Sequence, residues 1–404
     1  MKYVIVLGDG MADEPIPELG GLTPLEYAKT PVLDAMAPVS EIGLACTIPE
    51  GMSPGSDTAN LSVLGYDPRQ YYTGRSPLEA LSIGVDMKPD DVALRTNLIT
   101  VSDGNEPYEE KVIIDHSSGE ISTEDAAVLL DAVRKELEDD TYHFYVGTSY
   151  RHLLIWEKGS VVPLTPPHDV LGQKTGAYLP ADEKLLEMQK RSYEILSCHP
   201  LNLERKRQGL NPANSCWFWG AGTRPALVSF EEKNGKKGAM ISAVDLLKGI
   251  AAGAGMTNIQ VEGANGQLHT NYEGKARAAA DALLKDGFDF VYVHVEAPDE
   301  MGHQGSWERK VQSIEYLDQR LIKHLKEALD ASGEPYRMMV LPDHPTPIRV
   351  RTHTSDPVPF LLYDSTKTQN GQDVYSEKAA RESGLTVSRG CELIDRLFEK
   401  TEIR

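Results

Sequence analysis

Cysteine is scarce in this sequence, and the few thiols are scattered. The 404 residues contain only Cys46, Cys198, Cys216 and Cys391, and no two of them form a CxxC pair. This spacing excludes a disulfide framework and a thiolate zinc site. We therefore expect a protein of the reducing cytoplasm.

Long apolar segments are also missing. The opening apolar run, Tyr3 to Leu7, is too short for a signal-peptide core, and Asp9, Asp13 and Glu14 follow it closely. No export segment or membrane-spanning segment is predicted. A loop of the pattern Gly-x4-Gly-Lys-Ser/Thr is absent as well, which excludes a P-loop kinase.

Basic residues are outnumbered, with 41 Lys and Arg against 61 Asp and Glu and a formal charge of −20. Such a surface repels phosphate backbones and anionic lipid, so nucleic acid and membrane are not expected as partners. A small anionic substrate stays compatible with this charge, because basic side chains or metal ions can reverse the field inside a cleft. The length and the 40% of hydrophobic residues predict an ordered chain of two domains.

Short buried runs near both ends of the chain predict one α/β domain. The runs are Lys2 to Leu7, Phe288 to Val295, Tyr336 to Leu341 and Val358 to Tyr363. Helical patterns cover Ala243 to Ala254, Asn271 to Leu284 and Ser306 to Ala331. This alternation is typical of a mostly parallel sheet with helices on both faces. The predicted core domain comprises residues 1–90 and 236–404.

The middle of the chain has a different pattern. Strand-like runs cover Val92 to Val101, Lys111 to Ile114, Tyr142 to Val146 and His152 to Trp156, with helical patterns at Thr123 to Leu137 and Glu183 to Leu196. Strands in neighbouring pairs favour a mixed α+β sheet. We expect an inserted α+β domain at residues 91–235.

Two stretches near the start of the chain carry candidate reactive groups. Asp9 directly follows the first predicted strand, and Ser56 lies in the small-residue turn Pro54-Gly-Ser-Asp-Thr-Ala. A serine at a helix start meets free backbone N–H groups, which favour an alkoxide or a phosphate ester. For a single serine in such a turn, a simple helix cap is the commoner role.

Two later stretches supply carboxylates and imidazoles. Asp299 and His303 are four residues apart, one helical turn, so both can face one ion. Asp343 and His344 end a predicted strand, and His353 follows a short loop. One such pair alone is more often a surface hydrogen bond than a metal site. Together with Asp9 and Ser56, these residues are about what two divalent ions need.

The motifs resemble those of a known family. LGDGMAD at Leu7 to Asp13, PGSDTANLSVLGYDP at Pro54 to Pro68, EAPDEMGH at Glu296 to His303, and PDH with THTSDPVPF between Pro342 and Phe360 are similar to the alkaline phosphatase superfamily. Within it, the chain resembles the archaeal-type, cofactor-independent phosphoglycerate mutases. Further matching segments, among them NPANSCWFWG and HTNYEGKA, extend this resemblance over nearly the whole chain. It implies an alkaline-phosphatase-like core.

The resemblance also implies a reaction and a site. The reaction is the interconversion of 3-phosphoglycerate and 2-phosphoglycerate through a phosphoserine, without 2,3-bisphosphoglycerate. The implied nucleophile is Ser56. One implied metal site is Asp9, Ser56, Asp343 and His344, and the other is Asp299, His303 and His353. Oxygen and nitrogen ligands suit manganese, zinc or magnesium, and the sequence leaves that choice open.

In the family, the inserted domain closes over a small phosphorylated substrate. Basic residues in the matching segments are Arg151, His152, His168 and Arg224. Arg75, which follows a glycine turn near the Ser56 segment, is a further candidate for substrate binding. Ordinary surface charge is the alternative interpretation of these residues. The oligomeric state is left open.

One segment departs from the usual family pattern. Where relatives often show DHSTP, this chain has Asp343-His-Pro-Thr-Pro, a version that resembles a subgroup proposed to be homoserine kinases. The alternative function is therefore a homoserine kinase-like phosphotransferase that uses the same dimetal serine site.

Overall fold

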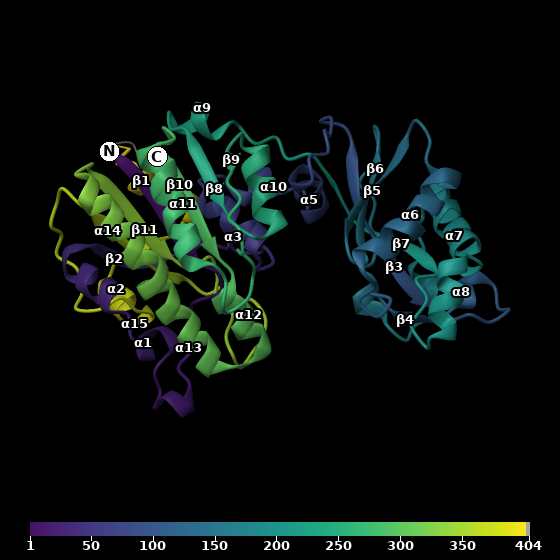
Figure 1. Ribbon diagram of the computed structural model, residues 1–404, viewed down its shortest axis with the longest axis horizontal. Coiled ribbons are helices and arrows are strands. Elements are labelled where there is room, and N and C mark those ends of the chain that lie inside the picture. Colours follow the sequence, from purple (N-terminus) through teal and green to yellow (C-terminus); the bar gives the residue numbers. More distant parts are fainter. Residues whose placement is uncertain (401–404) are drawn as a thin grey trace. The chain divides into compact units, whose positions relative to one another are not determined.

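The computed structural model describes residues 1–400, and the chain in it forms two compact units. The first unit is Met1–Tyr72 with Leu227–Arg404, and the second is Thr73–Ala226. In Figure 1 the first unit contains both the purple and the yellow ends of the chain. Among the described residues, no helix is long and apolar enough to cross a membrane.

The first unit is built on a sheet that has eight strands within residues 1–400, in the order β13-β2-β12-β11-β1-β10-β8-β9. The strands are β1 (Lys2–Gly8), β2 (Glu41–Ala45), β8 (Gly238–Ile241), β9 (Thr257–Asn258), β10 (Phe290–Val295), β11 (Tyr336–Leu341), β12 (Val358–Asp364) and β13 (Thr386–Val387). Strand β1 pairs in parallel with both β10 and β11, and lies between them in Figure 1. Strand β12 is antiparallel to β11 and β2. The predicted mostly parallel sheet is confirmed, with β12 as its exception.

Helices cover both faces of this sheet. The helices of the first unit are α1 (Pro24–Tyr27), α2 (Pro31–Met36), α3 (Ser56–Val63), α4 (Pro68–Tyr71), α9 (Phe230–Asn234), α10 (Asp245–Gly253), α11 (Tyr272–Leu284), α12 (Ala297–Gln304), α13 (Trp307–Tyr316), α14 (Lys323–Ser332), α15 (Glu377–Glu382) and α16 (Leu393–Leu397). Alternate side chains of a strand point to opposite faces. Val4 and Val6 belong to a core with α11 and α14. Tyr3, on the other face, meets Phe398 just after α16, with ring centroids 4.8 Å apart.

The long helix predicted from Ser306 to Ala331 is present in three parts. Helices α13 and α14 are joined by a π-helical turn, Leu317–Ile322. In that turn, Asp318 accepts hydrogen bonds from the backbone N–H groups of Val32 and Leu33, at 3.1 and 2.8 Å. It thereby caps the first turn of α2, whose N-cap residue Thr30 makes no side-chain capping bond.

The second unit has a five-stranded sheet among the described residues, and every recorded pairing in it is antiparallel. Its strands are β3 (Val92–Val101), β4 (Ile113–Asp115), β5 (Tyr142–Thr148), β6 (Arg151–Trp156) and β7 (Ser215–Thr223). Its helices are α5 (Arg75–Ser82), α6 (Thr123–Leu137), α7 (Glu183–Ser197) and α8 (Pro200–Arg207). The sequence does not predict β7, which pairs with β3.

The second unit begins and ends earlier in the chain than the predicted domain 91–235. At its start, α5 packs on β3 and β7 and so belongs to it. At its end, Phe230 stacks on Phe290 of β10, with ring centroids 4.9 Å apart, and so belongs to the first unit. The role of this unit as a substrate-binding lid stays a prediction.

Candidate metal centre and active site

The carboxyl ends of three neighbouring strands bring the candidate ligands together. Asp9 follows β1, Asp343 and His344 follow β11, and the α12 residues Asp299 and His303 follow β10. These strands are adjacent and parallel, in the order β11-β1-β10. Parallel strands end at one edge of the sheet, which is where open α/β folds bind ligands.

Asp9, Asp343 and His344 form the inner part of this cluster. The Nε2 atom of His344 lies 3.5 Å from Asp9 Oδ1 and 3.4 Å from Asp343 Oδ2. The backbone N–H groups of Gly10 and His344 donate to Asp343 Oδ1, at 3.0 and 2.9 Å. Asp9 Oδ1 is buried and has no hydrogen-bond partner among the described residues. Such an unpaired carboxylate oxygen fits a position on a cation.

Ser56 is the first residue of α3, and its hydroxyl points at this cluster. The N-cap of α3 is Gly55, so Ser56 does not have the simple capping role. Its Oγ lies 3.1 Å from His344 Nε2. Asn60, one turn later and fully buried, donates to the carbonyl of Ser56 at 2.7 Å and to Asp343 Oδ2 at 2.9 Å. Asn60 thus links the first residue of α3 to the carboxylate of Asp343.

Asp299, His303 and His353 form the outer part. His303 Nε2 lies 3.1 Å from Asp299 Oδ2 and 3.1 Å from His353 Nε2, and His353 Nε2 lies 3.4 Å from Asp299 Oδ1. The carbonyl of Arg351 lies 2.9 Å from His303 Nδ1 and can only accept, so Nδ1 carries a proton. Nε2, which faces Asp299 and His353, is therefore the ring nitrogen that an ion could bind in place of a proton.

The electrostatics of the cluster favour bound cations. Burial and the negative charges of Asp343 and Asp299 raise the pKa of Asp9 well above its ordinary value. Burial would also raise the pKa of Asp299, but His303 and His353 outweigh it and hold that pKa well below its usual range. Hydrogen bonding to Asp299 raises the pKa of His303 to about 9. A divalent cation relieves the repulsion among these carboxylates.

Two groups of side chains can each hold a metal ion. One is Asp9, His294 and Asp343, and the other is Asp299, His344 and His353, with the ligand atoms of each group within 4.8 Å of one another. Five of the seven predicted ligand residues belong to these groups, and the other two, Ser56 and His303, lie 3.1 Å from His344 and Asp299. His344 lies between the two groups, because its Nε2 also contacts Ser56 and Asp9.

Comparison with known proteins places this chain in a family. A family model described as 2,3-bisphosphoglycerate-independent phosphoglycerate mutase matches residues 37–202. A protein of Geobacter sulfurreducens, named probable 2,3-bisphosphoglycerate-independent phosphoglycerate mutase, is 47% identical over 99% of this chain and 100% of its own. A mutase of the same description from Methanosarcina barkeri is 48% identical over 98% of each chain. The chain belongs to the family of 2,3-bisphosphoglycerate-independent phosphoglycerate mutases.

Two solved structures are also similar to this chain. The PH0037 protein from Pyrococcus horikoshii has a TM-score of 0.83 and 30% identity, over 98% of this chain and 96% of its own. The cofactor-independent phosphoglycerate mutase from Thermoplasma acidophilum has a TM-score of 0.68 and 29% identity, over 99% of each chain. The resemblance to phosphoglycerate mutases drawn from the motifs is thus confirmed.

Sequence reasoning missed two residues of this mutase-family site. His294 lies inside β10, opposite Leu7 of β1 in register, and its Nε2 is 3.1 Å from Asp9 Oδ2. Thr346 donates to Asp299 Oδ1 through its hydroxyl. In the sequence, His294 could have been noticed as a titratable residue inside an otherwise apolar strand. Thr346 is the threonine of the unusual Asp343-His-Pro-Thr-Pro segment, so this departure from the family pattern touches a candidate ligand directly.

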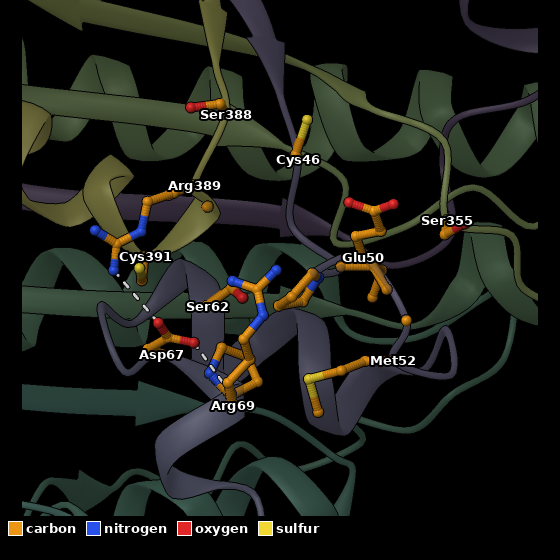
Figure 2. A pocket seen from close by; sticks show the side chains of 15 residues that line it. Cys46, Glu50, Met52, Ser62, Asp67, Arg69, Ser355, Ser388, Arg389 and Cys391 are labelled. Carbon is orange, nitrogen blue, oxygen red and sulfur yellow. Dashed lines mark hydrogen bonds and ion pairs between the residues drawn. The ribbon is translucent and has the colours of Figure 1, made fainter.

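Ser62, the other serine of α3, is buried and lines a separate cavity of about 440 Å³ (Figure 2). Two basic and two acidic side chains line it, namely Arg69, Arg389, Glu50 and Asp67. Arg389 lies 3.3 Å from Asp67, as the dashed line in Figure 2 marks. Neither of the two ligand groups lines this cavity, so Ser62 is on a different side of α3 from the reactive cluster.

Arg151 and His168 have the exposure that substrate contact in a mutase requires. Both lie in the second unit and are exposed. The Arg151 guanidinium lies 5.0 Å from the centre of the Tyr150 ring. The ring of His168 lies 5.4 Å from that of Trp219 and 6.0 Å from that of His116. His116 and Trp219 were not identified from the sequence, because neither belongs to a charged motif.

The other three predicted substrate residues have different surroundings. His152 is 2% exposed, accepts from the backbone N–H of Gly147 at 3.1 Å, and burial lowers its pKa to about 4. Arg75 pairs with Glu79 at 3.1 Å at the start of α5. Arg224 donates to the carbonyl of Met87 at 2.8 Å. His152 is therefore a neutral core side chain in this unit, whereas Arg75 and Arg224 are exposed.

Proposed function

We propose that the chain interconverts 3-phosphoglycerate and 2-phosphoglycerate without 2,3-bisphosphoglycerate. The observation that carries this proposal is the hydroxyl of Ser56, which faces a cluster of carboxylates and imidazoles at the sheet edge. Relatives that match almost the full chain at 47 and 48% identity are named for this activity.

We assign the first ion to Asp9, Ser56, Asp343 and His344, and the second to Asp299, His303 and His353. The unpaired Asp9 Oδ1 and the position of His303 Nε2 beside Asp299 and His353 support this assignment. Ligands of oxygen and nitrogen without thiolate suit manganese, zinc or magnesium. When bound, such ions offset the charge on the attacking and leaving oxygens.

Ser56 serves as the nucleophile. Its Oγ forms a bond to phosphorus while the ester oxygen of phosphoglycerate leaves, so the serine hydroxyl gives up a proton and the glycerate hydroxyl takes one up. The glycerate then reorients, and its other hydroxyl takes the phosphoryl group back from the phosphoserine. Because Ser56 stores the phosphoryl group, no 2,3-bisphosphoglycerate is required.

The second unit supplies the substrate contacts in this proposal. Arg151 and His168 are exposed there, and the rings of Tyr150, Trp219 and His116 flank them. Arg75 and Arg224 are further candidates, whereas His152 is buried in the core of the unit. As a lid, the unit would keep the glycerate from escaping and water from the phosphoserine.

Phosphorus NMR tests the activity directly. Manganese-loaded protein is incubated with 3-phosphoglycerate alone, and we expect the signal of 2-phosphoglycerate to grow to equilibrium. A second sample receives homoserine and ATP, and we expect no phosphohomoserine. Phosphohomoserine in the second sample, with no 2-phosphoglycerate in the first, would contradict the mutase proposal and support the homoserine kinase-like alternative.

A further inference from the structure

The two carboxylate oxygens of Asp9 have different surroundings. Oδ1 has no hydrogen-bond partner among the described residues and lies 3.5 Å from His344 Nε2. Oδ2 lies 3.1 Å from His294 Nε2. Oδ1 therefore faces the other candidate ligands, and Oδ2 faces back into the sheet.

His294 is held between two carboxylates in the interior of the first unit. Its Nε2 faces Asp9 Oδ2, and its Nδ1 lies 3.3 Å from Glu296 Oε1 and 3.2 Å from the hydroxyl of Ser242. The ring is 0% exposed. Both ring nitrogens therefore lie within 3.3 Å of a carboxylate oxygen.

Glu296 is itself fixed by three donors. The backbone N–H of Ala243 and the hydroxyl of Ser242 approach Oε1 at 2.9 and 3.3 Å, and Lys275 donates to Oε2 at 3.1 Å. Lys275, also 0% exposed, donates in addition to the carbonyl of His294 at 2.7 Å. A continuous set of contacts thus runs from Lys275 through Glu296 and His294 to Asp9.

We propose that His294, held by Glu296 and Lys275, is a positioning residue that orients Asp9 for the first ion. It holds Oδ2 so that Oδ1 is the oxygen presented to the metal. Partners of this kind, behind a ligand, change metal affinity by about 10- to 100-fold. The inference rests on the ion assignment of the proposed function, and it concerns metal binding alone.

The test is metal binding by the full-length protein without substrate. Chelator-treated protein is titrated with manganese by calorimetry, and cobalt is added separately to record its visible absorption. His294→Leu removes the polar contact with Asp9 Oδ2, whereas His294→Gln keeps a polar side chain at a similar place. Glu296→Gln leaves His294 in position but weakens its support. His324→Leu, on the exposed part of α14, is the matched control.

We expect two ions in the native protein and in the control. His294→Leu should weaken one ion by about 10- to 100-fold, Glu296→Gln should weaken the same ion less, and His294→Gln should restore near-native affinity with an unchanged cobalt spectrum. Native affinity in His294→Leu, or failure of His294→Gln to restore it, would overturn the proposal. A changed cobalt spectrum in His294→Gln would instead make His294 a direct ligand. If His294→Leu does not fold, the metal affinities of Glu296→Gln and His294→Gln test the proposal in its place. This test measures metal binding and not mutase activity. A failure of the proposed function would therefore be seen in the phosphorus NMR experiment and not here.

Discussion

Asp299 and His303 act as a pair because α12 places them one turn apart beside the end of β10. The spacing alone predicts this geometry, since residues four apart share a helix face. His294 could not be found in the same way, because its partner Asp9 lies on a neighbouring strand and only the strand register brings them together. Local spacing is visible in a sequence, whereas strand pairing is not.

Removing either residue of the pair should remove one ion. We expect Asp299→Ala or His303→Ala to bind one ion per chain instead of two and to lose activity by at least about 100-fold, because charge at one reacting oxygen is no longer offset. Elemental analysis and a mutase assay check this. Gln304→Ala, exposed at the end of the same helix, should keep both ions. Two ions and normal turnover in the Asp299 or His303 variant would remove these residues from the site.

Asn60 is a further residue whose importance only the structure shows. It bonds the carbonyl of Ser56 and Asp343 Oδ2, and it accepts the hydroxyl of Tyr292. We expect Asn60→Leu to cost about 1–3 kcal/mol in the free energy of unfolding for each buried partner left unpaired, and to reduce turnover because Ser56 and Asp343 lose their link. Denaturant unfolding and kinetics measure both effects. Tyr292→Phe, which leaves those two bonds in place, should keep most of the activity; equal losses in the two variants would contradict a role for the link.

At the scale of elements, the amphipathic pattern predicts the long helix α13 to α14 but not the π-helical turn inside it. Asp318 in that turn accepts hydrogen bonds from the amides of α2, a tertiary contact that the pattern does not show. Buried apolar runs likewise predict the strands β1, β10, β11 and β12. Such a run does not indicate whether a strand is parallel or antiparallel to its neighbours, so the sequence does not predict the antiparallel direction of β12. Strand β7 was missed because Gly220 and Gly222 interrupt its apolar pattern.

Asp318 makes the stability of this element depend on pH. Burial raises its pKa from 3.8 to about 6, although the amides of Leu33 and Val32 lower it. The folded state therefore holds the proton more tightly than the unfolded state, and the resulting stability is present below pH 4 and is lost as the pH rises through 6. We expect the free energy of unfolding to fall, relative to Asp318→Asn, by up to roughly 3 kcal/mol between pH 4 and pH 6.5. Urea unfolding of both proteins across this range measures the difference, and parallel curves would refute it.

At the scale of the whole molecule, the two units have separate cores, and each is described by its own cluster of buried side chains. The candidate ligands all lie in the first unit, and the exposed Arg151 and His168 lie in the second. The sequence predicts an insertion from its change of pattern, but the limits of the two units depend on which core α5 and Phe230 join.

This division predicts that substrate binding can be weakened without loss of metal. We expect Arg151→Ala to raise the KM for 3-phosphoglycerate by about 10- to 100-fold, the effect of losing a hydrogen bond to a charged group, while two ions per chain remain bound. Steady-state kinetics and elemental analysis together check this. Lys158→Ala, at an exposed position beyond β6, is the control and should leave KM unchanged. An unchanged KM for Arg151→Ala would show that Arg151 does not contact the substrate.

The central claim is that Ser56 carries the phosphoryl group during turnover, and locating the phosphate in acid-quenched enzyme tests it most directly. Manganese-loaded protein is mixed with 3-phosphoglycerate, quenched, digested and analysed by mass spectrometry. The account predicts phosphate on Ser56, none in Ser56→Ala together with loss of mutase turnover, and native phosphorylation in Ser62→Ala, whose hydroxyl faces the separate cavity. Phosphate on any other side chain of the native protein would contradict the account.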